Sequence, residues 1–268
     1  MILFVSDIHL CESRRAISSA FFAFLDQINA SYGAATDSTS IPTSIAKEIS
    51  GKLAQSGQID ITSGVKKLYI LGDLFNFWAG DDIESPIAAE FREHARALVD
   101  RGVELYFQPG NRDFAIGKQF AKSCEMSIIP AFYRLPEAPD LMLLHGDELC
   151  TDDVEYQRYK RWIRNPITLF ILRRTPRSYR LKLANKIRET SKNRADKAII
   201  DVSQETVDRV FKRYGLTEMI HGHTHRPNTH RETFGTRYVL SDWDKTGDYL
   251  VRTNSGDIFR IGVPIIGS

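Results

Sequence analysis

Residues 2–9 read ILFVSDIH. The four apolar residues at 2–5 are followed at once by polar ones, which is typical of a short buried strand that ends at Ser6 and Asp7. In α/β proteins, ligands bind beyond the carboxyl ends of the strands. A carboxylate at position 7 and a histidine at position 9 therefore indicate a candidate binding site directly after the first strand.

The same arrangement recurs along the chain. Apolar runs at 68–71, 105–108, 141–144 and 218–220 predict four more strands. The motifs that follow these runs are Gly72-Asp73, Gly110-Asn111-Arg112-Asp113, His145-Gly146-Asp147 and Gly222-His223-Thr224-His225. Each motif alone is weak, because Gly-Asp is a common turn pair. The ordered set predicts that five strand ends deliver metal-type ligands to one edge of one sheet.

The remaining segments predict an α/β core in a single domain over residues 1–268. Apolar spacing at 17–28 and 86–99 is typical of amphipathic helices, and alternation with turn residues over 237–263 indicates antiparallel strands. Residues 30–64 are rich in Ser, Thr, Ala and Gly. We interpret them as a surface insertion that is in part without regular structure, apart from a short helix near 45–53.

The composition excludes several classes of protein. Hydrophobic residues make up 42% and charged residues 26% of the chain, unlike a disordered, collagenous or coiled-coil protein. No apolar run approaches the ~18 residues that span a bilayer, and the N-terminus lacks the basic flank of a secretory signal. Three widely spaced cysteines, at 11, 124 and 150, indicate no disulfide framework, so we expect a reducing, cytoplasmic compartment.

The residue types in the five motifs point to a particular metal chemistry. Alternating histidines with carboxylates and an asparagine carbonyl form a mixed nitrogen and oxygen ligand set, which suits Mn, Fe or Zn better than calcium. A carboxylate such as Asp73 can bridge two ions. Two ions about 3.5–4 Å apart clamp an in-line displacement at phosphorus.

The five motifs, in this order, resemble those of the calcineurin-like metallophosphoesterases. The resemblance implies a four-layer α/β/β/α sandwich with an inserted helical cap, and two divalent metal ions that activate a hydroxide as the nucleophile. By matching positions, it implies that the first ion is held by Asp7, His9, Asp73 and His225. The second would be held by Asp73, Asn111, His145 and His223.

Longer runs narrow the resemblance. LFNFWAGDD at 74–82, GNRDF at 110–114, HGDELCTDD at 145–153 and HGHTHRP at 221–227 are together similar to the UDP-2,3-diacylglucosamine diphosphatases of lipid A biosynthesis. The resemblance implies hydrolysis of the pyrophosphate bond to UMP and 2,3-diacylglucosamine 1-phosphate, with Mn²⁺ as the preferred metal. It implies substrate contacts from Asn111, Arg112, Asp153, Ser191, Lys197 and His223.

Alternatives exist for two of these substrate contacts, Arg112 and Lys197. Arg112, next to Asn111, offers a fixed guanidinium fork to the phosphoryl oxygens, and we expect both residues to act in catalysis; a structural ion pair with Asp113 is the alternative. The stretch before residue 198 is shortened relative to the family, so Lys192 or Arg194 is an alternative to Lys197.

The charge is concentrated in one stretch. Residues 156–197 contain fourteen Lys or Arg and two Asp or Glu, a net charge of +12 in a chain that carries +2 overall. Apolar residues such as Trp162 and Phe170 are mixed among them. We interpret residues 154–200 as a helical cap whose apolar face holds acyl chains and whose basic face meets phosphate or the anionic inner-membrane surface. A solvated pair of basic helices packed on the sheet is the alternative.

The sequence is compatible with other functions. Another phosphoesterase acting on nucleotides or nucleic acid would use the basic stretch as a phosphate track. A protein phosphatase is disfavoured because Leu74–Trp78 lacks the Asp-Arg-Gly continuation of those enzymes, and a scaffold without metal is disfavoured because every ligand type is present. We expect a lipid-linked nucleotide substrate, peripheral association with the cytoplasmic face of the inner membrane, no nucleic acid and no obligate protein partner.

Three histidines and one asparagine remain. We expect His221 to support or pack against the metal site and His94, on a helix, and His230, in a loop, to be ordinary. Asn76 stands where the family usually has an acidic residue, so hydrogen bonding around it should differ.

Overall fold

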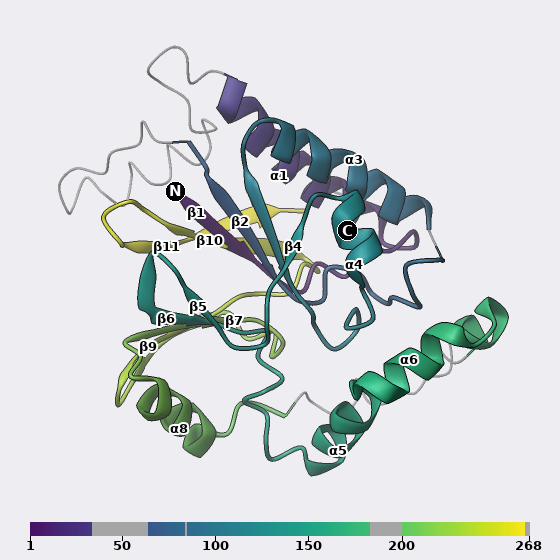
Figure 1. Ribbon diagram of the computed structural model, residues 1–268. Helices are drawn as coiled ribbons and strands as arrows, with labels where there is room; N and C mark the ends of the chain where they lie inside the picture. The colour runs from purple at the N-terminus through teal and green to yellow at the C-terminus, as the bar shows by residue number, and fades with distance from the viewer. Residues whose placement is uncertain (34–63, 84, 183–199, 266–268) are drawn as a thin grey trace.

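The computed structural model describes residues 1–33, 64–83, 85–182 and 200–265 (Figure 1). Two sheets face each other. The first has the strand order β11-β10-β1-β2-β3-β4, and the second has the order β5-β6-β7-β9-β8. The first contains β1 (Ile2–Val5), β2 (Lys67–Leu71), β3 (Glu104–Gln108), β4 (Ser127–Ile128), β10 (Thr246–Arg252) and β11 (Ile258–Pro264). The second contains β5 (Tyr133–Leu135), β6 (Ala138–Leu143), β7 (Glu218–His221), β8 (Asn228–Glu232) and β9 (Gly235–Val239).

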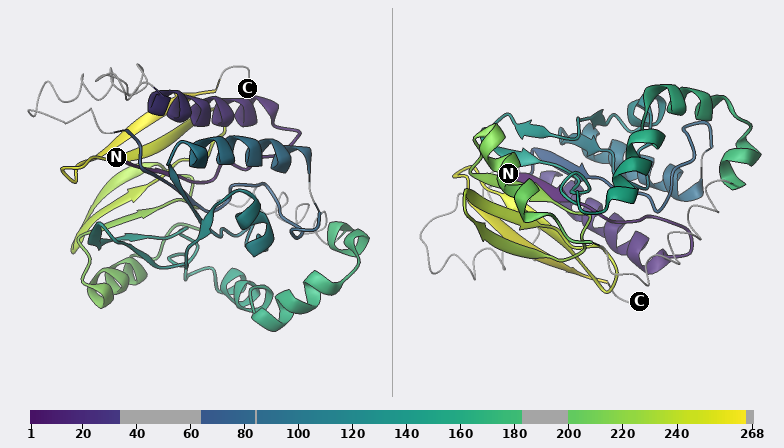
Figure 2. Two further views of the ribbon diagram at one scale, coloured as in Figure 1. Left: turned by 45° about the horizontal axis from the view of Figure 1, so that its top comes forward. Right: turned by 90° about the horizontal axis from the view of Figure 1, so that it is seen from below.

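Helices cover the outer faces of both sheets. Helices α1 (Arg15–Gly33), α3 (Pro86–Asp100) and α4 (Lys118–Ser123) lie on the first sheet, and α8 (Gln204–Tyr214) lies on the second (Figures 1 and 2). The side chain of Ser85 caps α3, and Gly215 ends α8 in the left-handed conformation that glycine adopts without a steric penalty.

The alternation of side chains along each strand builds three apolar layers. In β1, Leu3 and Val5 pack toward the helices, whereas Ile2 and Phe4 pack between the sheets. In β7, Ile220 joins the layer between the sheets and Met219 packs under α8. Successive side chains of a strand point to opposite faces, so a strand that is apolar throughout supplies residues to the layers on both sides of its sheet. The expected α/β/β/α order of layers is therefore confirmed.

The sheet arrangement corrects one prediction. The sequence pattern predicts all five ligand-bearing strand ends on one sheet, but β1, β2 and β3 belong to the first sheet and β6 and β7 to the second. The pairs β1–β2, β2–β3 and β6–β7 are all parallel, so each sheet presents its carboxyl ends at one edge. The two edges meet to form the site. The prediction was wrong because an apolar run reveals a strand but not its neighbour.

The C-terminal strands also differ in detail from the expectation. Strands β10 and β11 pair antiparallel, as predicted, but β9 pairs parallel with β7 while pairing antiparallel with β8. His230 lies within β8 rather than in a loop, so that prediction was wrong. The β8–β9 hairpin thus joins the second sheet through a parallel pairing with β7. The alternation of residues in the sequence does not reveal this pairing, because it depends on contacts between segments remote in sequence.

Two further helices, α5 (Val154–Ile163) and α6 (Pro166–Arg174), lie in the chain between β6 and β7 and extend away from the sheets (Figure 1). Asp153 and Asn165 cap them with side-chain oxygens. Most of the predicted insertion at 30–64, including its short helix, lies outside the described residues, as does the end of the predicted cap. Among the described residues, none of the helices combines the length and apolar character that crossing a bilayer needs.

Candidate metal centre

The loops after the strands share an unusual backbone conformation. Asp7, His9, Asp73, His223 and His225 all have φ between 53° and 67°. Residues other than glycine rarely adopt this left-handed region, and where they do, they cluster at functional sites because the surrounding structure must hold them there. The sharp bends turn these side chains back over the strand ends.

Close approach of the loops requires glycine at two positions. A Cβ on Gly110 would lie 2.2 Å from Oδ1 of Asp73, and one on Gly222 would lie 2.1 Å from Oδ2 of Asp7. Both distances are far below van der Waals contact, so any side chain here would displace a carboxylate. The Gly-Asn and Gly-His motifs of the sequence therefore have a steric reason.

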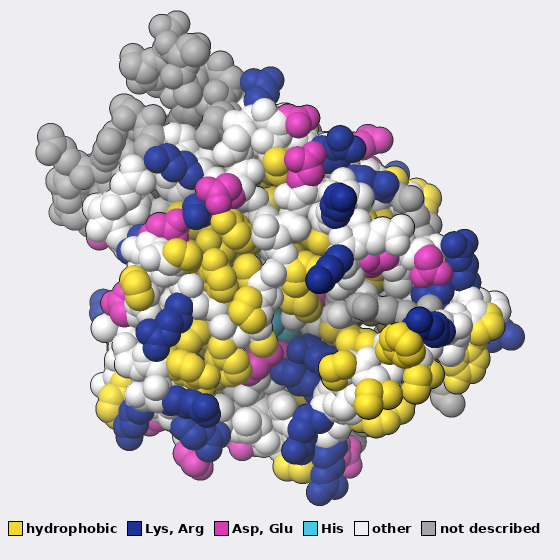
Figure 3. All heavy atoms as spheres, viewed as in Figure 1, with side chains coloured by type: hydrophobic (Ala, Val, Ile, Leu, Met, Phe, Trp, Pro, Cys, Tyr) yellow, Lys and Arg dark blue, Asp and Glu magenta, His cyan; other side chains and the backbone are white. Residues whose placement is uncertain are grey.

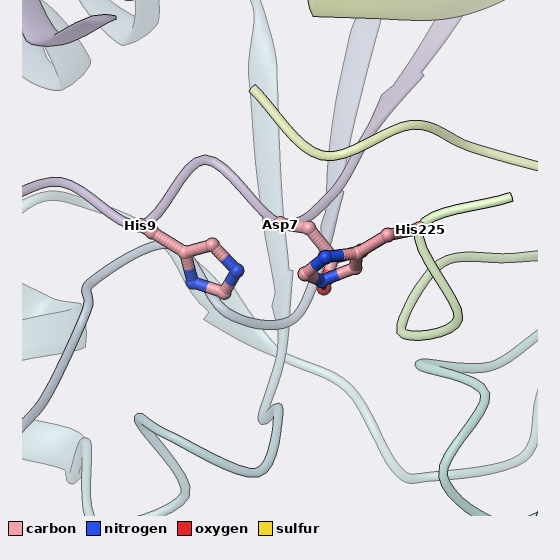
Figure 4. A group of neighbouring side chains, drawn as sticks. All are labelled: Asp7, His9 and His225. Carbon is pink, nitrogen blue, oxygen red and sulfur yellow. Dashed lines mark ion pairs between the residues drawn. The ribbon is translucent and has the colours of Figure 1, made fainter. Parts of the chain in front are cut away.

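The first group of candidate ligands is Asp7, His9 and His225 (Figure 4). One ligand atom from each lies within 4.8 Å of the others, and Nε2 of His225 lies 3.4 Å from Oδ1 of Asp7. Both ring nitrogens of His9 are buried without a hydrogen-bond partner among the described residues, and so is Oδ1 of Asp7. Buried polar atoms without partners are costly, and a bound cation would satisfy them.

The second group joins the other loops. Oδ1 of Asn111 lies 2.9 Å from Nε2 of His145 and 2.9 Å from Nδ1 of His223. Nδ1 of His145 lies 2.8 Å from the carbonyl oxygen of Leu71, an acceptor, so in the neutral imidazole Nδ1 would carry the proton and Nε2 the lone pair. An imidazole held in this way is oriented to bind a metal through Nε2.

Asp73 lies between the two groups. Its Oδ2 is 3.9 Å from Nδ1 of His9, and its Oδ1 is 3.8 Å from Nε2 of His145. The two oxygens of one carboxylate thus face opposite groups, which is the arrangement expected of a bridging ligand. The donor set of carboxylate oxygens, imidazole nitrogens and an amide oxygen fits two divalent ions such as Mn²⁺, Fe²⁺ or Zn²⁺.

Burial and neighbouring charges perturb the acid–base properties of the site. Burial would raise the pKa of Asp7, but the neighbouring imidazoles of His225 and His145 hold it below its ordinary value. Burial would lower the pKa of His225, yet the nearby carboxylates of Asp242 and Asp7 raise it to about 10. Burial and then the charge of Arg112 lower the pKa of His9. Strong perturbation of several groups in one place is typical of functional sites.

Two supporting carboxylates were not assigned by sequence reasoning. Asp113 accepts hydrogen bonds from the backbone N–H groups of Leu74 at 2.7 Å and Gly110 at 2.8 Å, and so braces two ligand loops against each other. Oδ2 of Asp242 lies 3.3 Å from Nδ1 of His225. Asp113 belongs to a recognised motif, whereas Asp242 follows β9 without any motif and could be found only from the fold.

Arg112 lies at the rim of the centre. Its Nε is 3.6 Å from Oδ2 of Asp73, and an NH group donates to Oδ1 of Asn76 at 2.7 Å. Asp113 instead accepts backbone hydrogen bonds. The alternative of an Arg112–Asp113 ion pair is therefore not the arrangement in the structure. About a third of the Arg112 side chain is exposed, so it is accessible to a ligand.

The remaining predicted substrate residues fall in two places. Asp153 caps α5 by accepting from the N–H of Tyr156 at 2.9 Å. Ser191, Lys197 and the alternatives Lys192 and Arg194 lie outside the described residues. His221 is buried, and Nε2 of its ring lies 3.1 Å from an NH group of Arg237, while Nδ1 lies 2.8 Å from the carbonyl of Gly222.

Comparison with known proteins agrees with this site. Residues 1–227 match the family described as calcineurin-like phosphoesterase. A protein of Tolumonas auensis named UDP-2,3-diacylglucosamine hydrolase is 38% identical over 272 residues, which cover 98% of this chain and 97% of that one. A protein of the same name from Pseudomonas syringae pv. tomato is 38% identical over 256 residues, 92% of this chain and 90% of its own. The chain belongs to the UDP-2,3-diacylglucosamine hydrolase family of calcineurin-like phosphoesterases.

Proposed function

We propose that the protein hydrolyses the pyrophosphate bond of UDP-2,3-diacylglucosamine and releases UMP and 2,3-diacylglucosamine 1-phosphate. The observation that carries the proposal is the buried cluster in which Asp73 faces two groups of candidate ligands. Relatives that match this chain over nearly its full length carry the name of this activity.

The residues at the site fit two divalent ions. The first would be held by Asp7, His9, Asp73 and His225, and the second by Asp73, Asn111, His145 and His223. We infer Mn²⁺ for both because the resemblance to the diphosphatases implies it, and the mixture of imidazole with carboxylate and amide oxygens is compatible with Mn as it is with Fe or Zn. Bound divalent ions supply positive charge to phosphoryl oxygens and lower the pKa of a coordinated water molecule.

The chain itself contributes orientation and charge. Arg112 would place its guanidinium on the phosphoryl oxygens, where a fixed cation stabilises charge that grows in the transition state. Asn76 holds that guanidinium through its amide oxygen without neutralising it. Asn111 would contact both a metal and the substrate from the same loop.

The lipid half of the substrate would bind along α5 and α6. Exposed apolar side chains gather there, including Trp162 at 63%, Ile167 at 70% and Ile171 at 58% exposure. Figure 3 shows these helices as a yellow surface with blue basic side chains beside it, next to a hollow in which a histidine is visible. Exposed apolar surface is expected to bind apolar groups, here acyl chains, and its basic border suits an anionic membrane surface.

The test is a metal-dependent assay with the purified protein. UDP-2,3-diacylglucosamine in detergent is incubated with Mn²⁺ or with a chelator, and UMP release is measured, with UDP-N-acetylglucosamine as the lipid-free control. We expect release with Mn²⁺, none with the chelator and little from the control. Activity on generic phosphodiesters without UMP release from the lipid would contradict the proposed substrate and favour the nucleotide or nucleic-acid alternative.

A further inference from the structure

Two acidic residues in the loop after β6, Asp147 and Glu148, form a buried ionic cluster outside the set of candidate metal ligands. Asp147 is fully buried, and its two carboxylate oxygens lie 2.8 Å from Nζ of Lys160 and 2.8 Å from an NH group of Arg164. Oε1 of Glu148 lies 2.9 Å from the same lysine. Two carboxylates and two cations thus balance in charge at the base of α5.

The cationic partners come from one face of α5 and its C-terminal end. Tyr156, Lys160 and Arg164 are spaced by four residues and therefore lie above one another on the helix. The hydroxyl of Tyr156 also donates to Asp147, at 2.6 Å. The opposite face of the helix carries exposed side chains such as Arg158 and Trp162. The cluster thus fixes which side of α5 faces the site.

The cluster also reaches the metal loops. The NH group of Arg164 that pairs with Asp147 donates to the carbonyl oxygen of Gly110 at 2.9 Å, and Gly110 precedes the candidate ligand Asn111. The ring of Tyr156 stacks on the ring of His223 with centroids 6.2 Å apart. Arg164 is therefore shared between α5, the loop after β6 and the loop after β3.

Stability alone is a weak reason for such a cluster. The attraction within a buried ion pair is largely offset by the cost of removing both charges from water, and apolar residues of similar size often stabilise as well. Directional bonds to fixed charges do, however, determine where a helix sits. Arg suits this place because one nitrogen of its guanidinium donates to a carboxylate and a carbonyl while the other terminal nitrogen lies 3.8 Å from Glu148. The planar, rigid guanidinium fixes these directions, whereas a lysine ammonium is compact and rotates freely.

We propose that Asp147 and Arg164 are positioning residues for substrate binding, which hold α5 at a fixed place beside the metal centre. Through α5 they would set the position of Asp153 and of the apolar side chains that we assign to the acyl chains. This inference rests on the proposed function for its substrate. It differs from a role in metal binding, because neither side chain is a candidate ligand.

The test compares Arg164→Lys with Arg231→Lys, a change at an exposed position of β8. Both variants keep the net charge of the protein, but only the first removes the guanidinium that contacts both Asp147 and Gly110. For Arg164→Lys we expect KM for UDP-2,3-diacylglucosamine to rise on the order of tenfold, with a smaller change in kcat, because the helix that carries the substrate contacts is no longer held in place. Affinity for Mn²⁺, measured by calorimetric titration, should stay within twofold. Amide hydrogen exchange in α5 should become faster. Arg231→Lys should leave all three unchanged.

Three results would overturn the inference. Unchanged KM and unchanged exchange in α5 would mean that the cluster does not position the helix. Equal losses in kcat and Mn²⁺ affinity would mean that Arg164 acts on the metal loop through Gly110. If the unmodified protein does not release UMP, the proposed function is wrong, but the positioning of α5 is still tested by hydrogen exchange. Equal exchange rates in α5 of the two variants would then overturn the positioning of α5 as well. Should Arg164→Lys fold poorly, Lys160→Gln is compared with Lys122→Gln at an exposed position of α4, because both remove one positive charge but only Lys160 contacts Asp147 and Glu148. Faster exchange in α5 for Lys160→Gln alone is then the expected result.

Discussion

An NH group of Arg112 donates to Oδ1 of Asn76 at 2.7 Å. The partner is neutral, so the guanidinium is held in place while its charge is left for another anion. Among the described residues, the carboxylate oxygen that approaches the guanidinium is Oδ2 of Asp73, which lies 3.6 Å from Nε of Arg112 and faces the candidate metal ligand His9. Asn76 therefore orients the guanidinium of Arg112 at the rim of the site without cancelling its positive charge.

Asn76→Ala should weaken catalysis because it removes the acceptor that orients Arg112. A hydrogen bond to a charged group contributes ~1.5–3 kcal/mol, so kcat/KM should fall by about tenfold or more. Steady-state kinetics of UMP release measure this. Asn76→Asp keeps an acceptor for the guanidinium at the same place and should lose less. An Ala variant with unchanged kcat/KM would contradict the role given to Asn76.

Arg112→Ala should lower kcat more than it raises KM. A cation that meets charge developed in the transition state contributes mainly to the chemical step, and removal of one such group costs about 10²–10³-fold in rate. The measurement is a full dependence of UMP release on substrate concentration, with Mn²⁺ content of each protein determined in parallel. A variant that raises KM only, at full metal content, would assign Arg112 to ground-state binding instead.

Much of the site could be predicted from the sequence, because its signals lie within short stretches of consecutive residues. A strand that ends in a polar residue beside glycine is visible in a few consecutive residues, and the structure brings together the side chains of Asp7, His9, Asp73, His145 and His225. Their roles as ligands stay predictions. The failures concern pairing: β6 and β7 form a second sheet, and β9 runs parallel to β7. Pairing depends on packing between segments remote in sequence, to which periodicity is blind.

Supporting residues were missed for a related reason. Asp242 reaches His225 only because β9 and β10 lie in different sheets, so the link between them passes the metal centre. Nothing in the residues around position 242 distinguishes it from a turn. Ser191 and Lys197 lie outside the described residues, so their roles as substrate contacts stay predictions.

Asp242→Ala should weaken metal binding without altering the ligand set. The carboxylate lies 3.3 Å from Nδ1 of His225 and so orients the ring for binding through the other nitrogen. Loss of a partner of this kind typically costs 10–100-fold in metal affinity. Calorimetric titration with Mn²⁺ gives the affinity directly. Asp244→Ala, at an exposed carboxylate two residues away, is the control, and equal affinities for the two variants would rule out the role of Asp242.

The pair of Asp82 and Arg180 should make folding stability depend on acidity. The hydrogen bond from Arg180 lowers the pKa of Asp82 to about 2, from 3.8. A carboxyl with a lowered folded-state pKa stabilises the fold above its unfolded pKa, and this contribution is lost as the pH falls from about 4 toward 2. The Asp82 side chain is 41% exposed, so solvent screening limits the effect to less than about 1 kcal/mol. Urea unfolding of the unmodified protein and Asp82→Asn should differ near pH 6 and converge near pH 2. Arg180→Gln should remove that dependence on pH, and a constant difference between the two proteins across this range would contradict the assignment.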